Sequence, residues 1–215
     1  MQANERRSLP AGAKAPVVFD IDGVLADFIA GYRQRASLIT GKPLDIYGHD
    51  KSMTFEAVPE LNEEEARLAV ESIMSKPNGR FWEGLPSAVS EETWLRIREL
   101  TEQRDVYFVT AREGPEVKQQ TEAWLLEHLS IRPTVIISSA KADECRALSA
   151  GWSIEDRLEN AVSIAATSGA RSCLINRSYN RKVLPDFPQG FDSHQFMRVD
   201  SVDEYLNIIN GESNE

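Results

Sequence analysis

Short apolar runs that alternate with helical patterns constrain the fold of this chain more than any other feature. The runs are Val17 to Ile21, Val106 to Val109, Thr134 to Ile137, Trp152 to Ile154 and Ser172 to Ile175. Near-continuous apolar runs of this length are typical of parallel strands that are buried on both faces. Strands that alternate with helices form a parallel sheet with helices on both faces. We therefore predict an α/β fold with a Rossmann-like parallel sheet.

Helix signals support the same alternation. Gly114-Pro115 precedes apolar positions at helical spacing from Val117 to Leu129, and such a pair is a good helix-start signal. A further helix is expected to begin near Ser90. Another, which contains Ala161 and Ile164, is expected to end before Gly169, a plausible C-cap.

A stretch of about sixty residues after the first predicted strand breaks the alternation and contains two amphipathic helical patterns. One pattern is Leu25, Phe28, Ile29, Tyr32, Ala36 and Ile39. The other is Ala66, Ala69, Val70, Ile73 and Met74, opened by Asn62 with Glu65 three residues on, which resembles a capping box. We predict that residues 31–86 form a helical cap over the carboxyl edge of the sheet. Residues 14–30 and 87–215 would form the α/β core.

Composition narrows the range of partners. The 24 lysines and arginines against 34 aspartates and glutamates give a net charge of −10 in 215 residues. This balance disfavours a nucleic-acid polymer or an anionic membrane surface as partner. Cys145 and Cys173 are expected to be buried lone thiols, which favours a reducing compartment. With a polar amino terminus and no long apolar run, we expect a cytoplasmic protein of unknown oligomeric state.

The strongest local signal is Asp20-Ile21-Asp22-Gly23-Val24 at the end of the first predicted strand. Residues two apart on an extended chain point the same way, so both carboxylates project from the sheet's carboxyl edge. Open α/β sheets bind ligands at that edge. A calcium loop is excluded because Val24 and Gly31 occupy positions that require oxygen ligands. The two aspartates therefore either repel one another or share a cation.

Three further polar sites follow the later strands in order. Thr110 ends the second strand, Lys141 opens the helix after the third, and Glu155-Asp156 ends the fourth. Each alone fits an ordinary structural role, as a helix-entry hydroxyl, a surface lysine or an acidic helix start. Four polar sites at four strand ends are hard to assign to chance. We expect them to form one site.

The order Asp20-x-Asp22-Gly23, Thr110, Lys141 and Glu155-Asp156 resembles the four motifs of the haloacid dehalogenase superfamily of phosphotransferases. The resemblance spans nearly the whole predicted core. The longer string from Asp20 to Phe28 is also similar to the 5'(3')-deoxyribonucleotidase family. So are Asp156-Arg157 with Glu159-Asn160, and Arg177-Ser-Tyr-Asn180.

The resemblance implies a phosphatase with a covalent intermediate. Asp20 would attack phosphorus, and Asp22 would act as general acid and then general base. Mg²⁺ would be held by Asp20, the Asp22 carbonyl and an acid from Glu155-Asp156. Thr110, Ala111 and Lys141 would bind the phosphoryl group. A carboxylate at the Asp22 position marks phosphatases in this superfamily rather than true dehalogenases.

Two positions depart from the nucleotidase pattern. Ala111 stands where a hydroxyl residue is usual, and Arg112 could replace the missing phosphate donor. Glu155 stands where an aspartate is usual, so either Glu155 or Asp156 could contact the metal.

Substrate specificity is expected in the cap. Phe28 aligns with an aromatic residue that lies against the base in the nucleotidases, and Trp82 could supply an opposing face. Packing within the cap is an equally good role for Phe28. Tyr179-Asn180 could close the mouth of the substrate site. His49, His128 and His194 lack the spacing of ligand residues.

The expected substrate is a small phosphomonoester, with a 5'-deoxynucleoside monophosphate as the best substrate. The alternative functions are a phosphatase of sugar phosphates or other small phosphomonoesters, a phosphomutase, a nucleic-acid 3'-phosphatase and a catalytically silent binding protein. The acidic charge disfavours the 3'-phosphatase. The presence of Asp20, Asp22, Thr110 and Lys141 argues against the silent protein.

Overall fold

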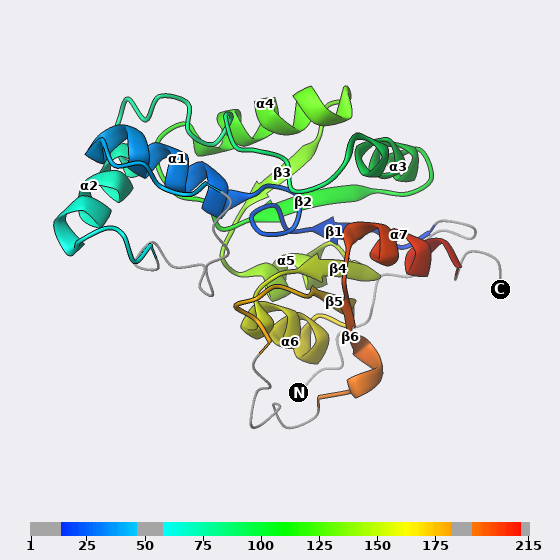
Figure 1. The fold of residues 1–215 in the computed structure, drawn as a ribbon. Coiled ribbons are helices and arrows are strands. Elements are labelled where there is room, and N and C mark those ends of the chain that lie inside the picture. Colours follow the sequence, from blue (N-terminus) through cyan, green and yellow to red (C-terminus); the bar gives the residue numbers. More distant parts are fainter. Residues whose placement is uncertain (1–13, 47–57, 182–190, 212–215) are drawn as a thin grey trace.

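A parallel β-sheet forms the centre of the molecule in the computed structural model, which describes residues 14–46, 58–181 and 191–211 (Figure 1). The sheet has six strands in the order β3-β2-β1-β4-β5-β6, and every neighbouring pair is parallel. The strands are β1 (Val17–Phe19), β2 (Val106–Thr110), β3 (Thr134–Ile137), β4 (Trp152–Glu155), β5 (Arg171–Ile175) and β6 (Phe196–Val199). This architecture confirms the predicted α/β class.

Helices cover both faces of the sheet, as Figure 1 shows. One face carries α3 (Glu91–Thr101), α4 (Val117–Leu129) and α7 (Val202–Gly211). The other carries α5 (Lys141–Ala147) and α6 (Leu158–Thr167). Side chains alternate along β1 to serve both layers: Val17 and Phe19 join the large core that includes Trp94, while Val18 packs in a smaller cluster with Ile164. The central strand is therefore buried on both sides, as its apolar run predicts.

Several local predictions are confirmed. Ser90 caps α3 through its side chain, and Asn62 with Glu65 forms a full capping box at the start of α2 (Glu63–Met74). Gly169 follows the end of α6 with a φ of +83°, a left-handed conformation that glycine adopts without strain. The first strand is shorter than its apolar run because the chain turns after Phe19, and Ile21 is buried in that turn.

The last strand and helix have no counterpart among the sequence predictions. A short helical turn, η2 (Ser193–Gln195), leads directly into β6, which pairs with β5. The α7 helix buries Val202, Tyr205, Leu206 and Ile209 at helical spacing. Arg96 of α3 ties this helix to the core by an ion pair with Asp203 at 2.5 Å.

The predicted cap region contains α1 (Phe28–Thr40) and α2, which pack against each other beyond the carboxyl ends of the central strands (Figure 1). Part of this region, including His49, lies outside the described residues. Two predicted members of the first helical stripe differ from expectation. Leu25 lies in the turn before α1, because Asp27 caps that helix, and Ile39 is 43% exposed.

Two backbone hydrogen bonds join the start and the end of the α1–α2 region. Asp27 donates to the Pro86 carbonyl at 2.8 Å, and Ala88 donates to the Leu25 carbonyl at 2.7 Å. The two crossings between core and predicted cap therefore lie side by side. Within the described ranges, no helix combines the length and the apolar character needed to cross a bilayer.

Candidate functional site

The turn that follows β1 positions Asp20 and Asp22. Asp20 donates its backbone N–H to the Ile154 carbonyl of β4 at 3.0 Å, and its Oδ1 accepts from the Ile21 N–H at 2.7 Å. Gly23 follows with a φ of +78°, and a Cβ on this residue would lie 2.2 Å from Asp156 Oδ2. Only glycine fits this turn, because the chain must pass directly beside the end of β4.

Lys141 links the ends of β1 and β4. Its Nζ lies 2.7 Å from Asp20 Oδ1 and also forms a short ion pair with Glu155. Burial disfavours the charged ammonium, but the two carboxylates outweigh it, so the pKa of Lys141 is raised. Lys141 therefore remains a fixed positive charge beside the predicted nucleophile.

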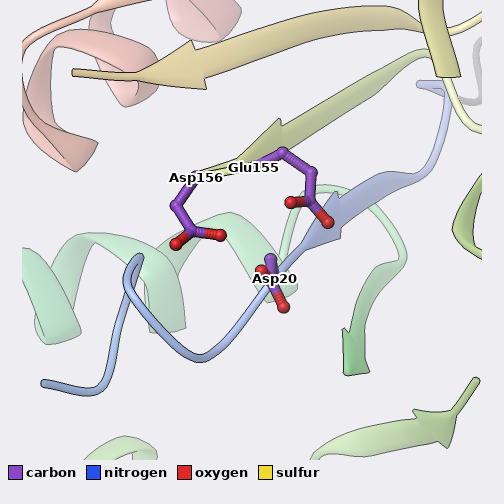
Figure 2. Close-up of side chains that lie close together, drawn as sticks. All are labelled: Asp20, Glu155 and Asp156. Carbon is purple, nitrogen blue, oxygen red and sulfur yellow. The ribbon is translucent and has the colours of Figure 1, made fainter. Parts of the chain in front are cut away.

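Three carboxyl groups converge at the ends of β1 and β4, as Figure 2 shows. Asp20, Glu155 and Asp156 each place an oxygen within 4.8 Å of the others, and all three residues are buried. Burial, and then the Glu155 charge, raise the pKa of Asp20 well above its ordinary value. The same two causes raise the pKa of Asp156 to about 7. A buried cluster with this excess of negative charge favours either a bound proton or a cation.

Asp156 and Glu155 differ in what they contact. Glu155 pairs with Lys141 and lies 3.4 Å from the Asn160 amide nitrogen. Asp156 accepts a hydrogen bond from the Tyr179 hydroxyl through Oδ2 at 2.5 Å, while its buried Oδ1 has no partner among the described residues. Buried carboxylate oxygens seldom lack a partner. Asp156 Oδ1 is therefore the oxygen best placed to bind a cation.

The segment after β5, which was predicted to close the substrate site, instead contacts the residues around Asp156. Asn180 donates to the Asp156 carbonyl at 2.6 Å, and Arg177 donates to the Gly23 carbonyl at 2.7 Å. Burial, and then the Asp156 charge, raise the pKa of Tyr179, so its hydroxyl keeps the proton that it donates. Tyr179 and Asn180 thus fix Asp156 from behind.

Asp22 points toward the end of β2. Arg112 donates to both of its carboxylate oxygens, at 2.7 Å from Nη2 to Oδ1 and 2.9 Å from Nε to Oδ2. The Thr110 hydroxyl lies 3.5 Å from Asp22 Oδ2. Asp22 and Asp20 therefore have separate cationic partners, although they are two residues apart.

A cavity of about 310 Å³ joins these groups to the predicted cap. Of the predicted catalytic, phosphate-binding, substrate-binding and metal-binding residues, all except Glu155 line it: Asp20, Asp22, Phe28, Trp82, Thr110, Ala111, Arg112, Lys141 and Asp156. Glu155, Tyr179 and Asn180 are not among the lining residues. Met74 of α2 lines it from the cap side, and Asn160 of α6 from the core side. No sequence pattern indicated that Met74 belongs to the site. Asn160 was indicated only by the resemblance of Glu159-Asn160 to the nucleotidases.

The aromatic wall of the cavity is packed differently from expectation. The Phe28 and Trp82 rings are stacked with centroids 6.0 Å apart, which is a distance of direct ring contact. Both residues are at least nine-tenths buried. The two rings form one continuous wall and leave no gap for a base between them.

Neither cysteine, and neither histidine that the structure describes, lines this cavity. His128 stacks on Trp94 with centroids 4.8 Å apart, and His194 is exposed. Cys145 and Cys173 are buried free thiols, as expected, and burial raises the pKa of each to about 12. A thiol that stays protonated is a poor nucleophile.

No protein-family model matches the chain, and no curated protein matches its sequence. Solved structures do share its fold. A haloacid dehalogenase-like hydrolase from Xanthomonas campestris is 15% identical with a TM-score of 0.53, and the match covers 93% of this chain and 96% of that one. A subfamily IA hydrolase of the same superfamily from Geobacter sulfurreducens is 14% identical with a TM-score of 0.56, covering 94% and 100%.

Two more matches widen the range of chemistry among the neighbours. A haloacid dehalogenase superfamily hydrolase from Bacillus subtilis, bound to magnesium, is 14% identical with a TM-score of 0.54, covering 92% and 99%. A dehalogenase is also 14% identical with a TM-score of 0.51, covering 93% and 98%. At these identities the likeness shows the fold alone. The chain therefore has the fold of the haloacid dehalogenase superfamily hydrolases.

Proposed function

We propose that this protein is a Mg²⁺-dependent phosphatase that hydrolyses a small phosphomonoester through an aspartyl-phosphate on Asp20. The observation that carries the proposal is the pair of aspartates after β1. Asp20 lies against Lys141 and the acidic cluster, whereas Asp22 lies beside Thr110 at the wall of the same cavity. A nucleophile and a separate acid and base are thereby placed in one site.

The two aspartates divide the proposed reaction into two balanced steps. In the first, an Asp20 oxygen forms a bond to phosphorus, the bond from phosphorus to the ester oxygen breaks, and the Asp22 carboxyl gives that oxygen its proton. In the second, water attacks phosphorus and passes a proton to Asp22, while the bond from phosphorus to Asp20 breaks. Phosphate leaves, and both aspartates return to their starting forms. Lys141 and Thr110 stabilise the charge on the phosphoryl oxygens.

The acidic cluster fits a hard divalent cation such as Mg²⁺, which prefers oxygen ligands. We assign Asp20, Asp156 and the Asp22 carbonyl as its ligands. Asp156 Oδ1 lacks a partner among the described residues, whereas both Glu155 oxygens accept hydrogen bonds, from Lys141, Asn160 and the Arg157 N–H. The ion would neutralise the buried carboxylates and draw negative charge from the phosphoryl group. Glu155 then serves to hold Lys141.

Phosphate transfer is favoured over carbon–halogen cleavage, although dehalogenases share the fold. The proposed leaving alkoxide needs a proton, and Asp22 supplies a carboxyl group at that place. The resemblance implies the same choice, because a carboxylate at this position marks the phosphatases of the superfamily.

The finer proposal is that the substrate is a 5'-deoxynucleoside monophosphate and that residues 31–86 act as a cap over it. Support comes from the resemblance of the Asp20 to Phe28 string and of Arg177 to Asn180. Phe28, Trp82 and Met74 line the same cavity as the carboxylates, so the organic part of a substrate would meet apolar side chains. A base would lie against this wall, since the wall itself has no gap. The unpaired thiols of Cys145 and Cys173 support a cytoplasmic location.

Phosphate release from a panel of substrates tests the proposal. The panel holds nucleoside and deoxynucleoside monophosphates, sugar phosphates and a 3'-phosphorylated oligonucleotide, each with and without Mg²⁺. We expect Mg²⁺-dependent release that is fastest with deoxynucleotides. A preference for sugar phosphates would overturn the nucleotide assignment and keep the chemistry. Isomerised product without phosphate would indicate a mutase, and binding without turnover a silent protein.

A further inference from the structure

Arg112 is a buried arginine whose contacts lie with Asp22 and the core. Its side chain is fully buried, whereas that of Asp22 is 17% exposed. Nε and Nη2 donate to Asp22, and Nη1 donates to the Thr121 hydroxyl at 3.0 Å. The three guanidinium nitrogens thus each donate to a protein group, which uses three of the five N–H donors. The edge formed by Nε and Nη2, which could bind a phosphate through two parallel bonds, is occupied by Asp22.

The surroundings of Arg112 hold its guanidinium in one orientation. The group lies 5.0 Å from the centre of the Trp82 ring and 5.8 Å from that of Trp124. Thr121 and Trp124 belong to α4, and the Trp124 indole donates to the Leu85 carbonyl at 2.7 Å. Cation–π contacts and the hydrogen bond to Thr121 restrict the planar guanidinium of Arg112 to one orientation. The Asp22 carboxylate that binds this guanidinium is therefore restricted as well.

We propose that Arg112 is a positioning residue that holds the Asp22 carboxyl group where both chemical steps need it. The proposal rests on the proposed phosphatase function and deepens it. Asp22 lies at the cavity wall, and it must reach the ester oxygen in the first step and the attacking water in the second. A bidentate arginine fixes both the place and the plane of a carboxylate.

Loss of this fork affects catalysis and spares binding. Without it, Asp22 samples other rotamers, so leaving-group protonation and water activation both become slower. Thr110 and Lys141 keep their positions, so the phosphoryl group of a substrate still binds. We expect Arg112→Gln to lower kcat about 100-fold, within the range of general acid–base effects, with KM changed less than about threefold.

Substrates with different leaving groups separate positioning from a general structural role. Dinitrophenolate leaves phosphorus without a proton, so 2,4-dinitrophenyl phosphate needs Asp22 only for the second step. Arg112→Gln should therefore release about one equivalent of dinitrophenol per enzyme in a burst and then turn over slowly. Alkyl phosphates, whose leaving group needs a proton, should show no burst. Asp22→Asn provides the reference for complete loss of the same group.

Two further variants keep the proposal testable if Arg112→Gln folds poorly. Thr121→Val removes one anchor of the guanidinium without altering the cavity lining, and we expect the same burst with a smaller fall in kcat. Arg96→Gln breaks an arginine pair at α7 and should behave like the wild type. Melting temperatures of Arg112→Gln, Asp22→Asn and the double variant should be non-additive if the two side chains are coupled.

Several results would overturn the proposal. A raised KM with unchanged kcat would make Arg112 a substrate ligand, and a higher kcat would make its pair with Asp22 inhibitory. Additive melting shifts would show that the two side chains are not coupled. If the wild type releases no phosphate from any substrate while the melting shifts are non-additive, the proposed function fails and the pair stands.

Discussion

The two ends of the cavity are built on opposite principles. At the sheet end, charged side chains follow the ends of four strands, β1 to β4, and are held by specific partners. Lys141 holds Asp20 and Glu155, and Arg112 holds Asp22. At the cap end, Phe28, Trp82 and Met74 meet the cavity as ordinary packing residues, and Phe28 and Trp82 touch each other. One end is fixed by electrostatic pairs and the other by shape.

This difference separates what each end can decide. In the proposed function, the fixed charges at the sheet end would recognise a phosphoryl group whatever is attached to it. Apolar packing at the cap end favours one organic group over another by contact area alone, which gives modest discrimination. We therefore expect substitutions at the sheet end to abolish turnover and those at the cap end to change preference.

The largest effect is expected from the two aspartates. Asp20→Asn and Asp22→Asn should each lower kcat at least ~1,000-fold, because they remove the nucleophile and the acid–base group, respectively. Circular dichroism and melting curves should show intact folds. Mg²⁺ binding, followed by calorimetry, should survive better in Asp22→Asn, which keeps its backbone carbonyl. Substantial turnover by Asp20→Asn would exclude the covalent mechanism.

The dependence of activity on Mg²⁺ should distinguish Asp156 from Glu155, the two acidic residues at the end of β4. Asp156→Asn should raise the Mg²⁺ concentration that gives half-maximal rate by at least ~10-fold, because it removes a ligand. Glu155→Gln should lower kcat at nearly unchanged Mg²⁺ dependence, because it loosens Lys141. Magnesium titrations of both variants check this. A larger shift in Glu155→Gln would reverse the two assignments.

A cap-end substitution tests the other half of the comparison. Phe28→Ala removes part of the apolar wall and should raise KM for deoxynucleotides by roughly 10- to 100-fold, from the energy of stacking on a base. The rate with p-nitrophenyl phosphate should change much less. Initial rates with the two substrates give the contrast. Equal losses would mean that Phe28 only packs within the cap.

The smallest expected effect is on the stability of the fold and comes from His128, which lies away from both ends of the cavity. Burial lowers the pKa of His128 below its ordinary 6.5, so the unfolded chain takes up a proton more readily than the folded one. Stability due to this group is therefore lost as pH falls through about 6.5 toward the lower folded value. Between pH 7.5 and 5.5 the melting temperature should fall roughly 1–3 °C more in the wild type than in His128→Gln. An identical fall in both proteins would refute it.

The sheet end could be predicted because strand periodicity fixes where polar residues emerge. Asp20, Thr110 and Glu155 each stand at or just after the end of an apolar run, and parallel strands bring such ends to one edge. The pairing of Asp22 with Arg112 could not be predicted. It joins residues 90 apart and depends on the direction of two side chains, which no local pattern encodes.

The cap end and the last part of the chain were harder to predict for different reasons. An aromatic residue at helical spacing gives the same sequence pattern whether it packs in the core or binds a ligand. The contact between Phe28 and Trp82 therefore could not be predicted from the sequence. The β6 strand contains the charged Arg198 and its side chains are mostly only partly buried, so it lacks the near-continuous apolar run that indicates the other strands. The α7 helix did carry a signal, because Val202, Tyr205, Leu206 and Ile209 repeat at helical spacing and Ser201 caps their start.

The hydrogen bond from Arg177 to the Gly23 carbonyl, between residues 154 apart in sequence, has a consequence for biosynthesis. At about 5–20 residues per second, roughly 10 to 30 s separate the synthesis of these two residues on a ribosome. During that interval the turn with Asp20 exists without the segment that fixes Asp156. A nascent chain halted before Asn180 would carry Asp20 but would lack contacts that fix Asp156, one of the proposed metal ligands. The proposed activity would therefore require translation to continue past β5.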